Sequence, residues 1–256
     1  MQAITAGGYR APSGAWLDWQ VQLQAACAGR ASIAPDDPLG SAALATYATT
    51  RVQVTNETTI GAALRLTQAG ARPLALNFAN GISAGGGFLH GARAQEEVLC
   101  RSSALFATLG GDRMYAAHRA RPRPDSTAWA IYSPDVPVFR TDGGETLEQT
   151  WPLNVLTCAA PVASRIGQPE SGDLLQARIL RVLAIARAYG YTTLVLGAWG
   201  SGAFANDAHR TARDFRQALQ TEYSGAFEQV VFAIADWSAD RRYLGPFRDA
   251  FLAGSD

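Results

Sequence analysis

Short apolar segments alternate with helical patterns from residue 51 onward, and this alternation constrains the fold more than any other feature of the sequence. The apolar runs fit strands, and the segments with apolar residues three or four apart fit helices. Strands that alternate with helices predict a layered α/β fold with a mostly parallel sheet. The expected strands are 52–55, 73–79, 128–132, 136–139, 154–159, 193–196 and 229–234, and the expected helices are 60–68, 95–109, 171–189, 207–221 and 241–252, the first of them capped by 56–59.

The first fifty residues differ from this pattern and are predicted to form an N-terminal helical extension, 1–50, before a main domain at 51–256. Segment 16–28 has a helical apolar pattern, and segment 34–40 is rich in turn residues. Nothing in the extension indicates catalysis.

The charge balance limits the classes of ligand. The chain has 22 basic and 22 acidic residues, and every basic residue is Arg. A protein that binds nucleic acids in general through phosphate contacts would carry an excess of basic residues. We therefore expect no general nucleic-acid binding. Three scattered cysteines favour a reducing compartment. No segment has the length of a membrane span, and the first residues do not resemble a signal peptide, so we expect a cytoplasmic protein, a monomer, with no membrane partner.

Segment 76–109 contains most of the candidate catalytic and ligand-binding residues. Between its predicted strand and helix lies a loop with three successive glycines, Gly85, Gly86 and Gly87. Residues without a Cβ adopt positive φ easily and let the backbone approach a ligand, and their N–H groups can converge on an anion. The loop leads to Arg93, Gln95, Glu96 and Glu97 at a helix start, where a phosphate is also favoured. Acidic residues there also stabilise a helix by themselves, and Arg93 fits a phosphate contact or a helix cap equally well.

A second glycine loop, 197–207, also follows a predicted strand and opens a helix. Ligands of open α/β sheets bind where such loops gather, beyond the carboxyl ends of the strands. A plain turn with Asn206 or Asp207 as helix cap would account for the same residues. A dinucleotide-binding fingerprint is the other alternative, but the third glycine is not at its proper offset.

The spacing of Gly85-Gly86-Gly87 to Gln95-Glu96-Glu97 resembles the signature of the poly(ADP-ribose) glycohydrolases, and most closely that of the shorter bacterial-type enzymes. The resemblance implies a macrodomain-like catalytic domain over 51–256, with a three-layer α/β/α fold and a mixed, mostly parallel sheet. It also implies hydrolysis of the ribose–ribose glycosidic bonds of poly(ADP-ribose), with release of ADP-ribose. The implied partners are poly(ADP-ribose), ADP-ribose and ADP-ribosylated target proteins, and no cofactor is implied.

The same resemblance implies roles for individual residues. Glu97 is the general acid, which then activates water, and Glu96 holds ribose hydroxyls. Asn80 is matched with the asparagine that contacts the distal ribose, although this chain has Ser83-Ala84 where the bacterial enzymes more often have Asn-Pro. The full set implied to contact substrate is Gly85, Gly86, Gly87, Phe88, Gln95, Asn80, Gly200, Ser201, Gly202, Ala203 and Phe204.

Two other functions remain open at this level: a hydrolase that removes single ADP-ribose groups from protein or nucleobase, and a non-catalytic ADP-ribose-binding macrodomain. Glu96 and Glu97 discriminate against the second, because a binding module needs no acid there. Among the remaining residues, the three histidines have no partner at metal-ligand spacing, so no metal site is expected. We interpret Asp135, Asp142 and Glu145 as solvated loop charges, and Trp129, Trp151 and Trp237 as core residues.

Overall fold

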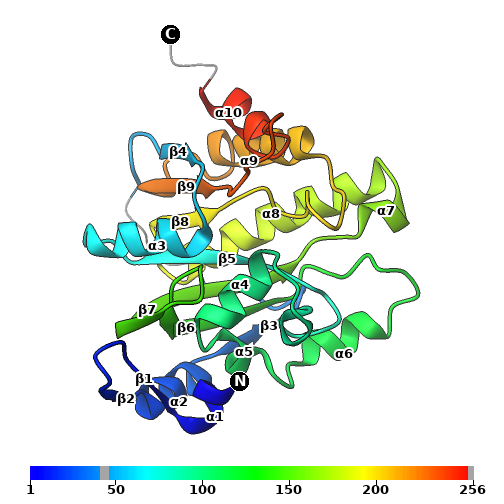
Figure 1. Ribbon diagram of the computed structural model, residues 1–256. Helices are drawn as coiled ribbons and strands as arrows, with labels where there is room; N and C mark the ends of the chain where they lie inside the picture. Colours follow the sequence, from blue (N-terminus) through cyan, green and yellow to red (C-terminus); the bar gives the residue numbers. More distant parts are fainter. Residues whose placement is uncertain (41–45, 253–256) are drawn as a thin grey trace.

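The computed structural model describes residues 1–40 and 46–252, and its centre is a seven-stranded mixed sheet (Figure 1). The strand order is β3-β6-β7-β5-β8-β9-β4. The pairs from β7 to β4 are parallel, whereas β6 is antiparallel to both β3 and β7. The strands are β3 Ala31–Ile33, β4 Arg51–Thr55, β5 Pro73–Ala79, β6 Ala130–Arg140, β7 Thr146–Ala159, β8 Thr193–Leu196 and β9 Gln229–Ala233.

Successive residues of a strand point to opposite faces of the sheet. Both faces of this sheet are apolar, and a layer of helices covers each of them. Leu74 and Leu76 of β5 pack in a core with α8, α9 and α10, whereas Ala75 belongs to a second core with α3, α4, α5 and α6. The predicted three-layer α/β/α fold with a mostly parallel sheet is therefore confirmed. The helices are α3 Thr59–Gln68, α4 Gln95–Ser102, α5 Leu105–Leu109, α6 Arg113–Arg119, α7 Ala163–Ile166, α8 Glu170–Ala188, α9 Ala208–Gln220 and α10 Leu244–Leu252.

The N-terminal segment contains strands as well as helices, which the predicted helical extension did not include. Helix α1 Gln2–Ala6 and helix α2 Gln20–Ala28 accompany a hairpin of β1 Gly8–Arg10 and β2 Trp16–Asp18, and β3 forms an edge of the main sheet. The helix expected at 16–28 begins only at Gln20, because Trp16 and Leu17 pair with β1. A domain boundary at residue 50 stays a prediction, and part of the segment before it, 41–45, lies outside the described residues.

The helix expected at 95–109 is wrong as a single element, because it is interrupted at Ser103. Ser103 has extended backbone (φ −139°, ψ 175°) and bridges to Val138 of β6. Its hydroxyl donates to Leu99 O at 2.7 Å and accepts from Leu105 N at 3.2 Å, so one side chain ends α4 and begins α5. A serine that competes for backbone partners in this way breaks a helix despite a continuous apolar pattern.

The three tryptophans interpreted as core residues divide into two groups. Trp129 and Trp151 are half-buried against the second core, but Trp237 is 78% exposed and the prediction for it is wrong. The neighbouring carboxylate explains the difference: Asp236 accepts hydrogen bonds from Tyr243 N at 2.8 Å and Leu244 N at 3.1 Å. This closed loop directs residue 237 outward.

Candidate active site

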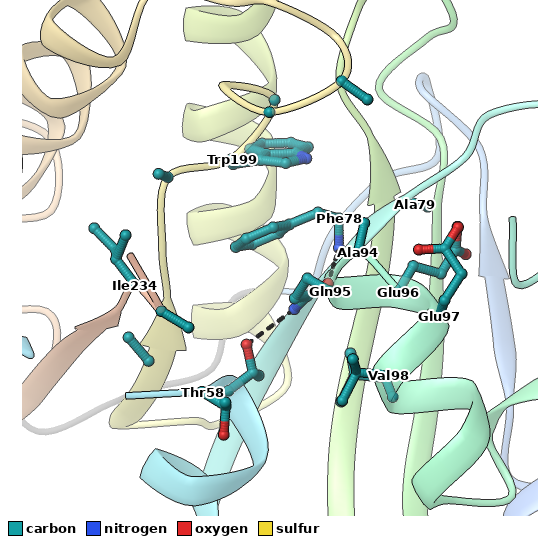
Figure 2. A pocket seen from close by; sticks show the side chains of 18 of the residues that line it. Thr58, Phe78, Ala79, Ala94, Gln95, Glu96, Glu97, Val98, Trp199 and Ile234 are labelled. Carbon is teal, nitrogen blue, oxygen red and sulfur yellow. Dashed lines mark hydrogen bonds between the residues drawn. The ribbon is translucent and has the colours of Figure 1, made fainter. Parts of the chain in front are cut away.

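A cavity of about 430 Å³ lies at the carboxyl ends of the parallel strands, where the sequence predicts a ligand site. Figure 2 shows Ile234 at one end of this cavity and the carboxylates of Glu96 and Glu97 at the other, with Phe78 and Gln95 between them. Both predicted loops contribute. The predicted site residues that line the cavity are Asn80, Gln95, Glu96, Glu97, Gly200, Gly202, Ala203 and Phe204.

Gln95 fixes the start of α4 on β5. Its side-chain oxygen accepts from Phe78 N at 2.9 Å (Figure 2). Its nitrogen donates to Leu76 O at 2.8 Å and Thr59 Oγ1 at 3.1 Å. Both the oxygen and the nitrogen of the Gln95 side chain are thus hydrogen-bonded within the protein. Gln95 lines the cavity, but its geometry indicates that it positions the next two residues.

Glu96 is buried, and both of its oxygens are engaged. Oε2 accepts from Asn80 N at 2.7 Å, and Oε1 accepts from Asn77 Nδ2 at 3.3 Å. Its residue is 3% exposed, and burial raises the pKa of Glu96 to about 8, against the opposing effect of these donors and with a further increase from the charge of Glu97. These two hydrogen bonds hold the carboxyl group of Glu96 in a fixed position beside Glu97.

Glu97 differs from Glu96 in having one oxygen without a partner. Oε1 accepts from Gly87 N at 3.0 Å, whereas Oε2 is buried and has no hydrogen-bond partner among the described residues. Buried polar atoms in native proteins almost always have partners, so an unpartnered carboxylate oxygen on a residue that lines the cavity indicates a ligand contact.

The glycine triplet approaches these carboxylates rather than the open cavity. Gly85 and Gly86 have φ of +69° and +56°, and a Cβ on Gly86 would lie 2.3 Å from Glu97 Oε1 and 3.1 Å from Glu96 Oε2. None of the three glycines lines the cavity. The sequence predicts close backbone approach here, and in the structure the group approached is the pair of glutamates.

Phe88 and Ser201, both expected to contact substrate, are not among the residues that line the cavity. The ring of Phe88 packs on Phe106 at 4.8 Å between centroids and lies against Gly85, so it supports the glycine loop from below. Ser201 is 6% exposed, and its backbone N–H donates to Ala198 O at 3.2 Å. Its hydroxyl lacks a partner among the described residues.

The second glycine loop is built to bring backbone donors to the cavity. A Cβ on Gly200 would lie 2.7 Å from Asn206 Nδ2, and Asn206 Nδ2 donates to Pro161 O at 2.8 Å. Among residues 1–40 and 46–252, the N–H groups of Gly202 and Ala203 donate no backbone hydrogen bond. Asp207, rather than Asn206, caps α9. Backbone N–H groups without a partner before a helix are the type of donor that binds anions.

Several cavity residues escaped the sequence analysis because they come from loops that carry no motif. Tyr243 and Ala235 follow β9, and Thr58 precedes α3. Asp142, interpreted as a solvated loop charge, lines the cavity and accepts a hydrogen bond from Thr58 Oγ1. Ala235 and Thr58 lie within three residues of the ends of β9 and β4, where loops of a parallel sheet converge, and this position was the detectable signal for them. Tyr243, ten residues beyond β9, and Asp142, in the turn between the antiparallel strands β6 and β7, carried no such signal.

The described part of the chain shows no cluster of metal-ligand side chains. Within it, no three His, Cys, Asp or Glu side chains lie close enough together to hold a metal ion. None of the helices in that part of the chain has both the length and the apolarity needed to cross a bilayer.

The raised pKa of Glu96 predicts a pH-dependent stability. Between its usual pKa of 4.5 and the folded value of about 8, the native state holds a proton that the unfolded state has released, so the free energy of unfolding falls as pH rises through this window. The decrease is at most about 5 kcal/mol. Burial lowers the pKa of His118, which acts with the opposite sign, so Glu96→Gln is the control. We expect the melting temperature of the wild type, relative to Glu96→Gln, to fall from pH 5 to pH 8, and parallel curves would contradict the assignment.

Comparison with known proteins links this geometry to a family. The model for "Microbial-type PARG, catalytic domain" matches residues 1–141. No curated protein gives a significant match.

Solved structures match over most of the chain. A poly(ADP-ribose) glycohydrolase from Thermomonospora curvata is 40% identical, with a TM-score of 0.92 over 98% of this chain and 96% of its own. The same enzyme bound to the inhibitor ADP-HPD is 38% identical, with a TM-score of 0.90 over the same shares, 98% and 96%. A poly(ADP-ribose) glycohydrolase from Deinococcus radiodurans in complex with ADP-ribose is 38% identical, with a TM-score of 0.83 over 90% of this chain and 97% of its own.

Proposed function

Because this chain belongs to the family of microbial-type poly(ADP-ribose) glycohydrolases, we propose that its cavity binds one ADP-ribose unit of the polymer with the scissile ribose–ribose bond beside Glu97. The chain is a hydrolase of poly(ADP-ribose), and the product is ADP-ribose. The single observation that carries the assignment of the reacting group is that Glu97 lines the cavity while its buried Oε2 has no hydrogen-bond partner among the described residues.

The cavity supports one orientation of the ADP-ribose unit. Ile60, Phe78, Ile234 and Tyr243 give the cavity an apolar lining, and Ile234 lies at the end away from the glutamates, which suits the adenine ring. The free N–H groups of Gly202 and Ala203 suit the diphosphate, and Phe204 gives the distal ribose an apolar surface. The distal ribose then lies at the end of the cavity that contains Glu96 and Glu97.

The reaction breaks the bond between the anomeric carbon of that ribose and the 2′-oxygen of the next unit. Glu97 donates its proton to the departing oxygen and then accepts a proton from the water that adds to the anomeric carbon. Neighbouring residues of a helix diverge by about 100°, so Glu96 and Glu97 cannot flank the bond as a conventional carboxylate pair. Glu96 instead holds ribose hydroxyls and keeps Asn80 and the glycine loop in place.

The test is incubation of the purified protein with poly(ADP-ribose) labelled in its adenine rings. We expect labelled monomeric ADP-ribose to accumulate, and we expect calorimetry to show binding of free ADP-ribose. Binding without release of ADP-ribose from the polymer would contradict the hydrolase and favour the non-catalytic module. Release only from proteins that carry single ADP-ribose groups would favour the mono-ADP-ribosyl hydrolase.

A further inference from the structure

An arginine-rich loop lies beyond the end of the cavity that contains the catalytic glutamates. Segment 118–125 reads HRARPRPD, with Arg at every second position from 119 to 123. Arg119, Arg121 and Arg123 are exposed, as are Arg93 and Arg165. We call these five residues the basic rim.

Hydrogen bonds attach one side of this loop to the wall that contains Glu96. His118 Nδ1 donates to Gly81 O at 3.0 Å, and Arg119 Nη1 donates to Ile82 O at 2.7 Å. The residue before Gly81, Asn80, lines the cavity and donates its N–H to Glu96. His118, at the beginning of the loop, is therefore bonded to Gly81, and the residue next to Gly81 is bonded to Glu96.

The other side of the loop is attached to the wall that contains Phe204. Val162 N donates to Pro124 O at 3.1 Å, and Ala163 N donates to Phe204 O at 2.8 Å. The buried guanidinium of Arg178 also donates to Asp125 O and fixes the loop from below. Arg93 lines the cavity itself, and Arg165 lies on α7 directly after these contacts. The basic rim thus spans both walls at one end of the cavity.

The rim carries an excess of positive charge in a chain that is neutral as a whole. Arg121 pairs with Asp125 at 2.5 Å and Arg123 pairs with Glu170 at 2.7 Å. Five guanidinium groups against these two carboxylates leave an excess of three positive charges. Exposed pairs of this kind contribute little to stability, so fold stability does not account for the concentration of arginines.

We propose that the basic rim binds the diphosphate groups of poly(ADP-ribose) units on the leaving-group side of the scissile bond. This inference rests on the proposed function, in which one unit fills the cavity and its distal ribose lies beside Glu97. The next unit must then continue out of this end of the cavity, and every unit carries a diphosphate. Guanidinium groups form charge-assisted hydrogen bonds with phosphate oxygens.

The test removes two rim charges that make no contact with the cavity, in Arg123→Gln/Arg165→Gln. The matched control is Arg187→Gln/Arg216→Gln, which removes the same charge from the C-terminal parts of α8 and α9, the helices that lead into the amino ends of β8 and β9. We expect kcat/KM for chains of many units at low salt to fall by about three- to tenfold in the rim variant, with kcat at saturation unchanged. The plot of log kcat/KM against log salt should become shallower by about 1.4, as expected for two lost phosphate contacts on a single-stranded polyanion.

The product gives an internal control, because free ADP-ribose has no leaving unit. Its Kd should stay within twofold in both variants, and the Arg187→Gln/Arg216→Gln control should keep the wild-type salt dependence. Equal salt dependence in the rim variant and the control would overturn the inference while leaving ADP-ribose release, and thus the proposed function, intact. An equal loss of affinity for single-stranded RNA of the same charge would also overturn it, because the rim would then be a general polyanion surface.

Discussion

Glu97→Gln is expected to lower kcat for polymer hydrolysis by about 10²–10⁴-fold, while the Kd for ADP-ribose changes by no more than a few fold. The amide keeps the size of the side chain and can still accept a hydrogen bond from Gly87 N, which lies 3.0 Å from Oε1. It cannot deliver a proton to the departing 2′-oxygen. The loss therefore falls on the transition state and leaves ground-state binding largely unchanged.

Glu96→Gln is the matched control for this prediction, because the two residues are adjacent on the same helical turn. Both oxygens of Glu96 already accept hydrogen bonds within the protein, whereas Oε2 of Glu97 has no partner among the described residues. We expect Glu96→Gln to cost less in kcat and comparatively more in KM and ADP-ribose affinity.

Initial rates, ADP-ribose affinity by calorimetry and melting temperatures should be measured for both variants. If the two acids only favoured the start of α4, both variants would lose a little stability and neither would lose rate selectively. Small and similar effects on kcat would therefore contradict the catalytic assignment of Glu97.

Much of the fold could be predicted because local pattern and tertiary environment agree in the centre of the sheet. The bounds of β5, Pro73–Ala79, and of β8, Thr193–Leu196, are those predicted, since both strands are apolar and buried on both faces. The pattern failed where a side chain competed with the backbone. Ser103 interrupts an apolar helical pattern through two hydrogen bonds, and no spacing of apolar residues contains that information.

The candidate site could be predicted in its motifs but not in the partners of those motifs. Gln95 was expected to contact substrate, yet its amide is bonded to Phe78, Leu76 and Thr59. Asp142 is exposed, as expected for a solvated loop charge, but it also lines the cavity with Tyr243, which the sequence did not indicate. A sequence identifies which residues can make polar contacts, but the partner depends on which loops the sheet order brings together.

The glycine triplet is the sharpest example of this limit, and it leads to a second large expected effect. Gly86→Ala should reduce kcat by about 100-fold or more, because its Cβ would lie 2.3 Å from Glu97 Oε1 and 3.1 Å from Glu96 Oε2. The carboxylates would have to move, and a displacement of about 1 Å in a reacting group costs about 10²-fold in rate. The alanine would also have to adopt the positive φ of Gly86, +56°, which adds a strain of about 1 kcal/mol to the folded state of the variant.

Gly91→Ala separates the contact from the strain. Gly91 lies in the same loop with φ of +84°, but a Cβ there would meet nothing within 4 Å. Both variants should therefore lose a similar, small amount of stability, and only Gly86→Ala should lose rate. The measurements are kcat, the melting temperature and the Kd for ADP-ribose in each variant. Equal rate losses would mean that loop strain, and not displacement of the glutamates, controls activity. An unchanged rate in Gly86→Ala would mean that the triplet does not set the position of Glu97, because the closest contact between loop and carboxylate would then have no effect on the chemistry.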